Sequence, residues 1–126
     1  MSARMSRRGP AGDRGSGTVL AVGVVAVLLS LTLAVLAVVA AVVAGHRARA
    51  AADLGALAGA VRYQQDPASA CAESGRVVAL NGAALESCAT AGDGRVEVVA
   101  SSPVRWRIWG LGRDRATARA LAGPQP

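Results

Sequence analysis

Residues 19–44 read VLAVGVVAVLLSLTLAVLAVVAAVVA, a run that contains no charged residue and only Ser30 and Thr32 as polar side chains. As a helix this run extends about 39 Å at 1.5 Å per residue, whereas the hydrocarbon core of a bilayer is about 30 Å thick. No other stretch of the sequence is comparable in length and apolarity. The sequence therefore predicts a single-pass membrane protein whose transmembrane helix covers residues 16–45.

Positive charge lies on both sides of this run without forming a patch. All 14 cationic residues are arginine and the formal net charge is +6, and the absence of lysine beside abundant Ala, Val and Gly is typical of GC-rich bacterial coding. Residues 1–15 form a basic tail of net charge +3, and residues 46–126 carry a further +3 spread over the rest of the chain. Because arginines close to a span favour the cytoplasmic side, we expect a cell-membrane protein with a cytoplasmic N-terminus and an extracytoplasmic C-terminal part. Charge this diffuse does not indicate nucleic-acid binding.

Beyond the span, residues 45–63 lack proline and are rich in alanine, the strongest helix former. The simplest prediction is one helix from about Ser16 to Tyr63, with residues 46–63 as its extension. Small residues recur in it every four positions, a spacing that lets helix backbones approach closely. We expect helix packing along this row, either against a partner protein or against the chain's own small domain. The small residues are Ala37, Ala41 and Gly45 in the span, Ala48, Ala52, Ala56 and Ala60 beyond it, and Gly55 and Gly59 in an adjoining row; together we call them the small-residue row.

Residues 64–126 predict a small extracytoplasmic domain, which gives the whole chain the fold class α+β. The residue before Pro67 is biased away from helical geometry, so the first helix breaks there and a second helix covers about Pro67 to Leu80. A short strand over Ala84–Thr90 follows, and alternating apolar and polar side chains predict strands over residues 95–101 and residues 103–110. Residues 113–122 keep the same period of two, although their alanine content leaves a helix as the alternative. We expect one helix lying over a small antiparallel sheet.

Cys71 and Cys88 both follow the span, and outside the cytosol they would pair. Such a bridge would contribute about 3 kcal/mol by restricting the unfolded chain. Two cysteines and the distant His46 do not supply the four ligands of a structural zinc site. His46 and Asp53 lie about two helical turns apart, too far for a catalytic pair, and no nucleophile motif or phosphate-binding loop accompanies them. We therefore expect no enzyme, no catalytic residues, no metal, no cofactor and no small-molecule substrate.

The segment RWRIW, residues 105–109, places arginine beside tryptophan. Packing within the domain is the favoured interpretation, and contact with the membrane surface is the alternative, because tryptophan is enriched at membrane interfaces. Base stacking is disfavoured because two tryptophans form a thin platform.

Two motifs carry a resemblance to a known family. The sequence RGSGTV, residues 14–19, leads into the apolar run, and RARAAADLGALAGA, residues 47–60, follows it. This layout resembles the TadE/TadG-like proteins of the tight-adherence (Flp) pilus and secretion system. The resemblance implies a non-enzymatic accessory or minor pilin-like component that contacts the lipid bilayer and other TadE/TadG-like, pilus or secretion membrane proteins.

In such pseudopilins a peptidase cuts after a glycine, and a glutamate five residues into the mature chain guides assembly. The matching glycine is Gly15, so Ser16 would begin the mature chain and the guiding position would fall on Leu20. The missing carboxylate favours an anchor that is not cleaved or does not polymerise. Three alternatives stay open: processing after Gly15, release of a secreted disulfide-stapled binding domain by signal peptidase near Ala44, and a membrane regulatory protein unrelated to pili.

Overall fold

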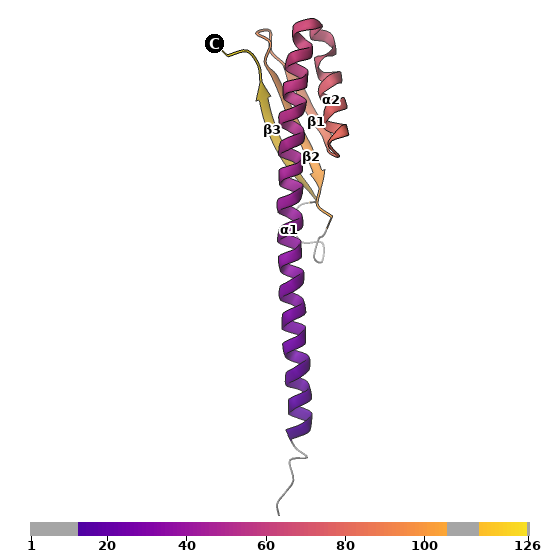
Figure 1. Cartoon of the computed structure of the whole chain (residues 1–126), viewed down its shortest axis with the longest axis vertical. Coiled ribbons are helices and arrows are strands. Elements are labelled where there is room, and N and C mark those ends of the chain that lie inside the picture. The colour runs from indigo at the N-terminus through magenta and orange to yellow at the C-terminus, as the bar shows by residue number, and fades with distance from the viewer. Residues whose placement is uncertain (1–12, 106–113, 126) are drawn as a thin grey trace, which may run out of the picture. The chain divides into compact units, whose positions relative to one another are not determined.

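The structure, a computed structural model, describes residues 13–105 and 114–125 (Figure 1). Its architecture is α+β, as the sequence predicts. The chain divides into two compact units, Met1–Val35 and Leu36–Pro126. The elements in chain order are the helix α1 (Asp13–Gln65), the 3-10 helix η2 (Pro67–Ser69), the helix α2 (Ala70–Leu80) and the strands β1 (Ala84–Thr90), β2 (Val96–Pro103) and β3 (Arg115–Ala122).

Helix α1 is 53 residues long and extends a few residues beyond both ends of the predicted range. In the first unit its side chains from Gly15 to Val35 are exposed. Within the described residues, it is the one helix long and apolar enough to span a membrane, with a mean hydropathy of 2.9 over its most apolar window. The hydroxyls of Ser30 and Thr32 donate to the carbonyls of Ala26 and Leu28, each at 2.8 Å. These two polar groups are therefore satisfied inside the helix, as a lipid environment requires.

The two helices are separated by a break at Asp66, whose backbone is extended at φ −152° and ψ 98°. Its carboxylate accepts from the Ala68 amide at 3.2 Å and caps the short 3-10 turn that begins at Pro67. Helix α2 ends at Leu80 and is followed by Asn81, which caps it, and by Gly82, which has a positive φ of 73°. Glycine adopts this left-handed conformation without steric cost, which reverses the chain into β1.

The three strands form an antiparallel sheet in the order β1-β2-β3. Strand β1 has the predicted bounds, and β3 confirms a strand rather than a helix near the C-terminus. The register of β1 against β2 shifts between Leu85 and Ser87. The third expected strand, residues 103–110, is wrong at its start, because Pro103 belongs to β2 while Val104 and Arg105 are not in a strand. Its remainder, with both tryptophans, lies outside the described residues.

In the second unit, the C-terminal part of α1 and α2 cover the same face of the sheet (Figure 1). The sheet is therefore covered by two helices, whereas the sequence predicted one. The buried cluster contains no side chain larger than valine, so the helices approach the sheet closely. Its members are Ala51, Ala52, Ala56, Ala70, Val78, Val96, Val98, Ala100 and Ala120.

Candidate interaction surfaces

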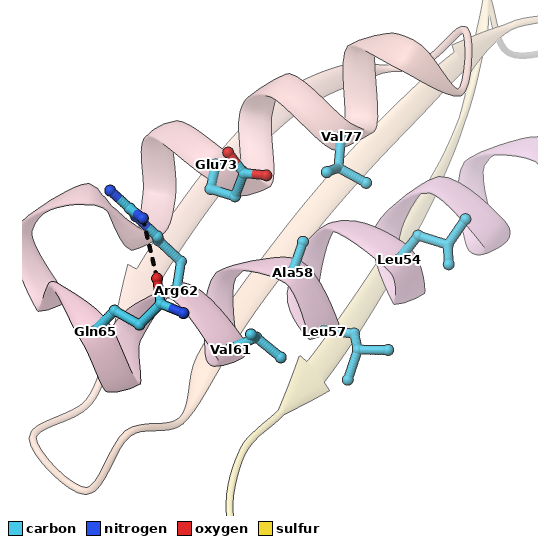
Figure 2. Close-up of a pocket in the computed structure, with 8 residues that line it drawn as sticks. All are labelled: Leu54, Leu57, Ala58, Val61, Arg62, Gln65, Glu73 and Val77. Carbon is cyan, nitrogen blue, oxygen red and sulfur yellow. Dashed lines mark hydrogen bonds between the residues drawn. The ribbon is translucent and has the colours of Figure 1, made fainter.

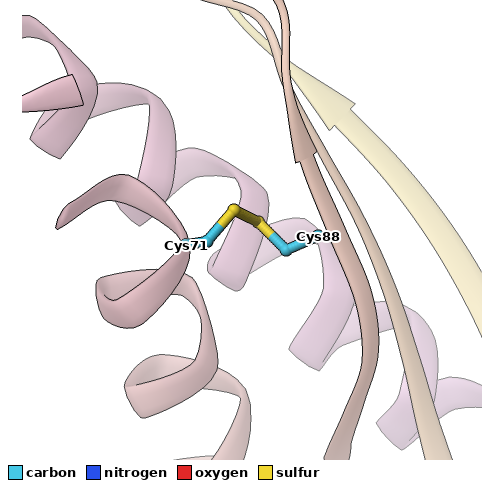
Figure 3. The surroundings of a disulfide bond; sticks show 2 residues. All are labelled: Cys71 and Cys88. Atoms are coloured by element: carbon cyan, nitrogen blue, oxygen red, sulfur yellow. A yellow bond between two sulfur atoms is a disulfide. The ribbon is translucent and has the colours of Figure 1, made fainter. Parts of the chain in front are cut away.

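Cys71 of α2 and Cys88 of β1 form a disulfide, with their Cα atoms 5.8 Å apart (Figure 3). This separation is typical of disulfides in proteins. The bond joins residues 17 positions apart in the sequence and fixes α2 to the edge strand of the sheet. The pairing that the sequence predicted for an oxidising compartment is thus present in the structure.

Two glycines of the small-residue row, Gly55 and Gly59 of α1, pack closely against α2 and β2 of the same chain. A Cβ atom added at Gly55 would lie 2.6 Å from Val78 Cγ2 and 3.2 Å from the Ser74 carbonyl oxygen. One added at Gly59 would collide with the Ser74 hydroxyl and lie 3.0 Å from Val96 Cγ1. The buried residues of α2, Ala70, Ser74 and Val78, also recur every four positions. Two small-residue rows therefore meet where α1 and α2 pack.

The small-residue row is buried within the chain from Ala48 to Gly59. Ala48, Ala52 and Ala56 are at most 1% exposed, and Gly55 and Gly59 are buried. A partner helix has no access to these five residues in the folded chain, because they are buried within it, Gly55 and Gly59 against α2 and β2. Of the two expectations, packing against the chain's own domain describes this part of the row, and Ala60 packs against the edge of the same core.

The other part of the row lies nearer the membrane and is less covered. Ala41 is exposed, Ala37 and Gly45 are half-buried, and a Cβ added at Gly45 would meet no atom within 4 Å. Packing of these three residues against another helix in lipid stays a prediction. The same holds for cleavage between Gly15 and Ser16, two exposed residues inside the first turns of α1.

An apolar groove of about 550 Å³ runs between α1 and α2 on the side away from the core (Figure 2). Leu54, Leu57 and Val61 of α1 line it and are 45%, 57% and 57% exposed. Figure 2 shows Val77 of α2 turned toward the same gap. Side chains of this size are seldom left together on the surface of a small domain without a partner, so the groove is a candidate docking surface.

Polar side chains close one end of this groove. Arg62 donates through Nη1 to Gln65 Oε1 at 3.1 Å and through Nε to Ser69 Oγ at 2.8 Å. Glu73 forms an ion pair with Arg76 one turn along α2. The hydrogen bond from Arg76 lowers the pKa of the Glu73 carboxyl below its usual value. The groove thus has an apolar floor and a charged rim that carries both signs.

The opposite face of the sheet is polar. The Ser101 hydroxyl of β2 donates to the Glu86 carboxylate of β1 and accepts from Arg115 Nε of β3 at 2.9 Å. Arg119 and Glu97 face each other on the same side at 3.7 Å. Charged groups with opposite signs across neighbouring strands stabilise a sheet modestly.

Comparison with known protein families finds a match in the N-terminal part of the chain. Residues 15–62 match the family described as "Putative Flp pilus-assembly TadE/G-like". The chain matches no curated protein and no solved structure. The resemblance expected from the sequence is confirmed over this range, which we call the TadE/G-like segment. It contains the whole apolar run and most of the helix that enters the core.

The TadE/G-like segment supports a role associated with the Flp pilus and, with the long apolar helix, a membrane location. Its family is one of pilus assembly and is not a known enzyme family. Among the described residues, no three side chains of His, Cys, Asp or Glu come together to hold a metal ion. His46 and Asp53 are both exposed on α1.

Sequence reasoning missed part of these surfaces. The spacing of Leu54, Leu57 and Val61 is visible in the sequence as an apolar stripe, but Val77 joins it only through the packing of α2 on α1. The cluster of Glu86, Ser101 and Arg115 leaves no signal in the sequence, because it depends on the pairing register of three strands.

Proposed function

We propose that this chain is a single-pass, non-enzymatic accessory or minor pilin-like component of a tight-adherence (Flp) pilus or secretion assembly. The observation that carries the proposal is the family match, which coincides with the apolar helix and its extension. In this proposal the N-terminus is cytoplasmic, the span anchors the protein and the small domain offers contacts outside the membrane. Other membrane proteins of the pilus or secretion system are its partners.

Two observations support the extracytoplasmic placement of the domain. The disulfide between Cys71 and Cys88 suits an oxidising compartment, because cytosolic thiols are kept reduced. The arginines of residues 1–15 lie on the other side of the apolar run, where the positive-inside rule favours the cytoplasm.

The surface offered to partners is the apolar groove lined by Leu54, Leu57, Val61 and Val77. From Ala48 onward the Gly and Ala row is covered within the chain, whereas Leu54, Leu57 and Val61 remain exposed. Its proposed occupant is the apolar face of a helix from another membrane protein of the assembly. Such a helix, anchored in the same bilayer, would leave the lipid next to α1 and meet the groove a few turns further along. An apolar helix face fits an apolar groove of this kind.

Site-specific photocrosslinking in cells that assemble the pilus tests this surface. A benzoylphenylalanine at Leu57 should crosslink to a membrane protein identified by mass spectrometry as a component of the pilus or secretion system. The matched control is the same probe at Leu121, which is 60% exposed but lies on β3 facing away from the groove. We expect at least tenfold more of the crosslinked product from position 57. Equal yields from both positions, or products without a pilus component, would refute the groove as the docking surface.

The intact mass of the protein recovered from its native membranes under non-reducing conditions tests the anchor. A mass of the full chain less two hydrogens, allowing for loss of Met1, supports an uncleaved anchor with the disulfide closed. A chain that begins at Ser16 would instead establish pilin-type processing despite Leu20. A fragment from Gly45 onward, found outside the membrane fraction, would replace the anchor with a secreted domain.

A further inference from the structure

A second groove lies at the opposite end of the domain from the η2 turn, where the sheet meets the last turns of the apolar run. It has a volume of about 280 Å³ and lies between α1 and the end of β2. Val39, Val43 and Ala44 of α1 and Pro103 of β2 form its apolar wall. Arg47 and Arg105 complete the lining. Ala44 is only 3% exposed, while Val39 and Val43 are about half exposed and accessible to a ligand.

The position of this groove along α1 places it at a membrane interface. The uncharged run ends at Ala44, and the first charged residue after it is Arg47. From Val39 to Arg47 the helix rises about 12 Å. The headgroup layer of a bilayer is about 5–8 Å thick on each side of the hydrocarbon core. The groove therefore covers both the last apolar turn of the span and the headgroup layer, provided that α1 spans the bilayer.

The charge of this groove has one sign. Both of its charged side chains are arginines, and among the described residues that line it none is acidic. Both guanidinium groups are exposed, and the Cδ atom of Arg47 lies 3.7 Å from the position that a Cβ at Gly82 would take. Guanidinium groups bind phosphate oxygens through paired hydrogen bonds. Two guanidinium groups next to an apolar wall are complementary to a molecule in which a phosphate is attached to methylene groups.

We propose that this groove binds the headgroup region of an anionic phospholipid. Arg47 and Arg105 hold the phosphodiester, and the first methylenes below it pack against Val39, Val43 and Pro103. The volume suits a headgroup and the start of its chains, and the remainder of the lipid stays in the bilayer. Such a lipid would fix the depth at which the domain meets the membrane, a role that goes beyond the proposed pilus function and rests only on its membrane-spanning helix.

Native mass spectrometry of the full chain in detergent, titrated with dioleoyl phosphatidylglycerol or dioleoyl phosphatidylcholine, tests the proposal. We expect the wild-type chain to retain phosphatidylglycerol at least fivefold more tightly than phosphatidylcholine. Arg47→Gln and Arg105→Gln should each weaken phosphatidylglycerol binding about fivefold, the effect of one basic residue at an anionic surface. Arg47→Lys and Arg105→Lys keep the charge and should preserve most of the preference.

The matched control is Arg49→Gln, which removes the same charge from α1 two positions further on, on another side of the helix. It should leave the preference for phosphatidylglycerol unchanged. An equal loss in Arg49→Gln would show diffuse attraction and overturn the site. Equal retention of both lipids by the wild-type chain would overturn it as well, as would Lys variants that lose the preference as fully as the Gln variants. Inorganic phosphate at the lipid's concentration should not compete, and displacement by it would indicate a site for free phosphate instead.

Discussion

Two regions of α1, residues 15–35 and residues 44–60, are built from the same kinds of small and apolar residues but differ in what surrounds them. In the first region a Cβ added at Gly15, Gly17 or Gly23 would meet nothing within 4 Å. In the second, the same addition at Gly55 or Gly59 runs into α2 and β2. All five residues are glycines, and only those in the second region are packed against the sheet and α2. A small residue in a long helix therefore indicates close packing only where another element of the chain, or a partner, reaches it.

The largest effect of the difference in packing between the two regions is expected for Gly59→Val. The new side chain would collide with the Ser74 hydroxyl and approach the Ala70 carbonyl oxygen, whose Cβ distance is already 3.3 Å. Backbone atoms cannot move aside without separating the helices, so we expect a loss of about 4 kcal/mol or more in the free energy of unfolding. Pulse proteolysis of the full chain in detergent over a urea series measures this loss.

Gly23→Val is the matched control for Gly59→Val, because it makes the same change in the same helix where the added atoms meet nothing. It should leave the unfolding free energy of the domain unchanged. Similar losses in both variants would show that valine harms α1 in general, and the contrast between the two regions would then not rest on packing.

Removal of the disulfide tests whether the span and the domain are stabilised independently, because both cysteines lie in the second unit. The double variant Cys71→Ser, Cys88→Ser should lower the free energy of unfolding by about 3 kcal/mol, since the unbridged chain gains freedom when it unfolds. The protein should still be recovered in the membrane fraction, because the span does not depend on the bond. The midpoint of urea unfolding measures the loss of stability, and membrane fractionation measures the retention. Loss of membrane retention would contradict the independence of the span.

The sequence predicted the elements of this chain well where one local signal decides them. The charge-free run identified α1, Asp66 and Pro67 identified its end, and the period of two identified β2 and β3. Within the Gly and Ala row, Gly55 and Gly59 lie in close contact with α2 and β2. The row's partner could not be read from spacing alone, because the choice between a second protein and α2 depends on the direction that the chain takes after the break at Asp66.

The remaining features depend on contacts between distant residues. The groove needs Val77 beside Leu57, and the polar cluster needs Glu86, Ser101 and Arg115 on three neighbouring strands. Neighbours of this kind follow from register and helix crossing, which composition and periodicity do not specify. The groove at Arg47 and Arg105 arises in the same way, from residues 58 positions apart.

The covered region itself contains a smaller contrast, between Ser101 and Ser102. Both residues are fully buried, but the Ser101 hydroxyl bonds with Glu86 and Arg115, whereas the Ser102 hydroxyl has no hydrogen-bond partner within the described residues. Ser101→Ala should therefore lower the free energy of unfolding by about 1 kcal/mol, and Ser102→Ala should leave it equal or slightly raise it. Urea unfolding of both variants measures the difference, and equal losses would contradict the assigned hydrogen bonds.

The smallest effect is expected at the exposed rim, where Arg76 lowers the pKa of the Glu73 carboxyl through a side-chain hydrogen bond. Arg76→Ala should raise that pKa toward its ordinary value, and carboxyl NMR titration of the full chain in detergent measures it. Because the folded pKa is the lower one, the pair stabilises the fold at pH values above the ordinary pKa of glutamate, about 4.3. This contribution is lost as the pH falls through the lowered value. Arg119→Ala, on the far face of the sheet, should leave the Glu73 titration unchanged, and an equal shift there would show that overall charge, not the bond, sets the pKa.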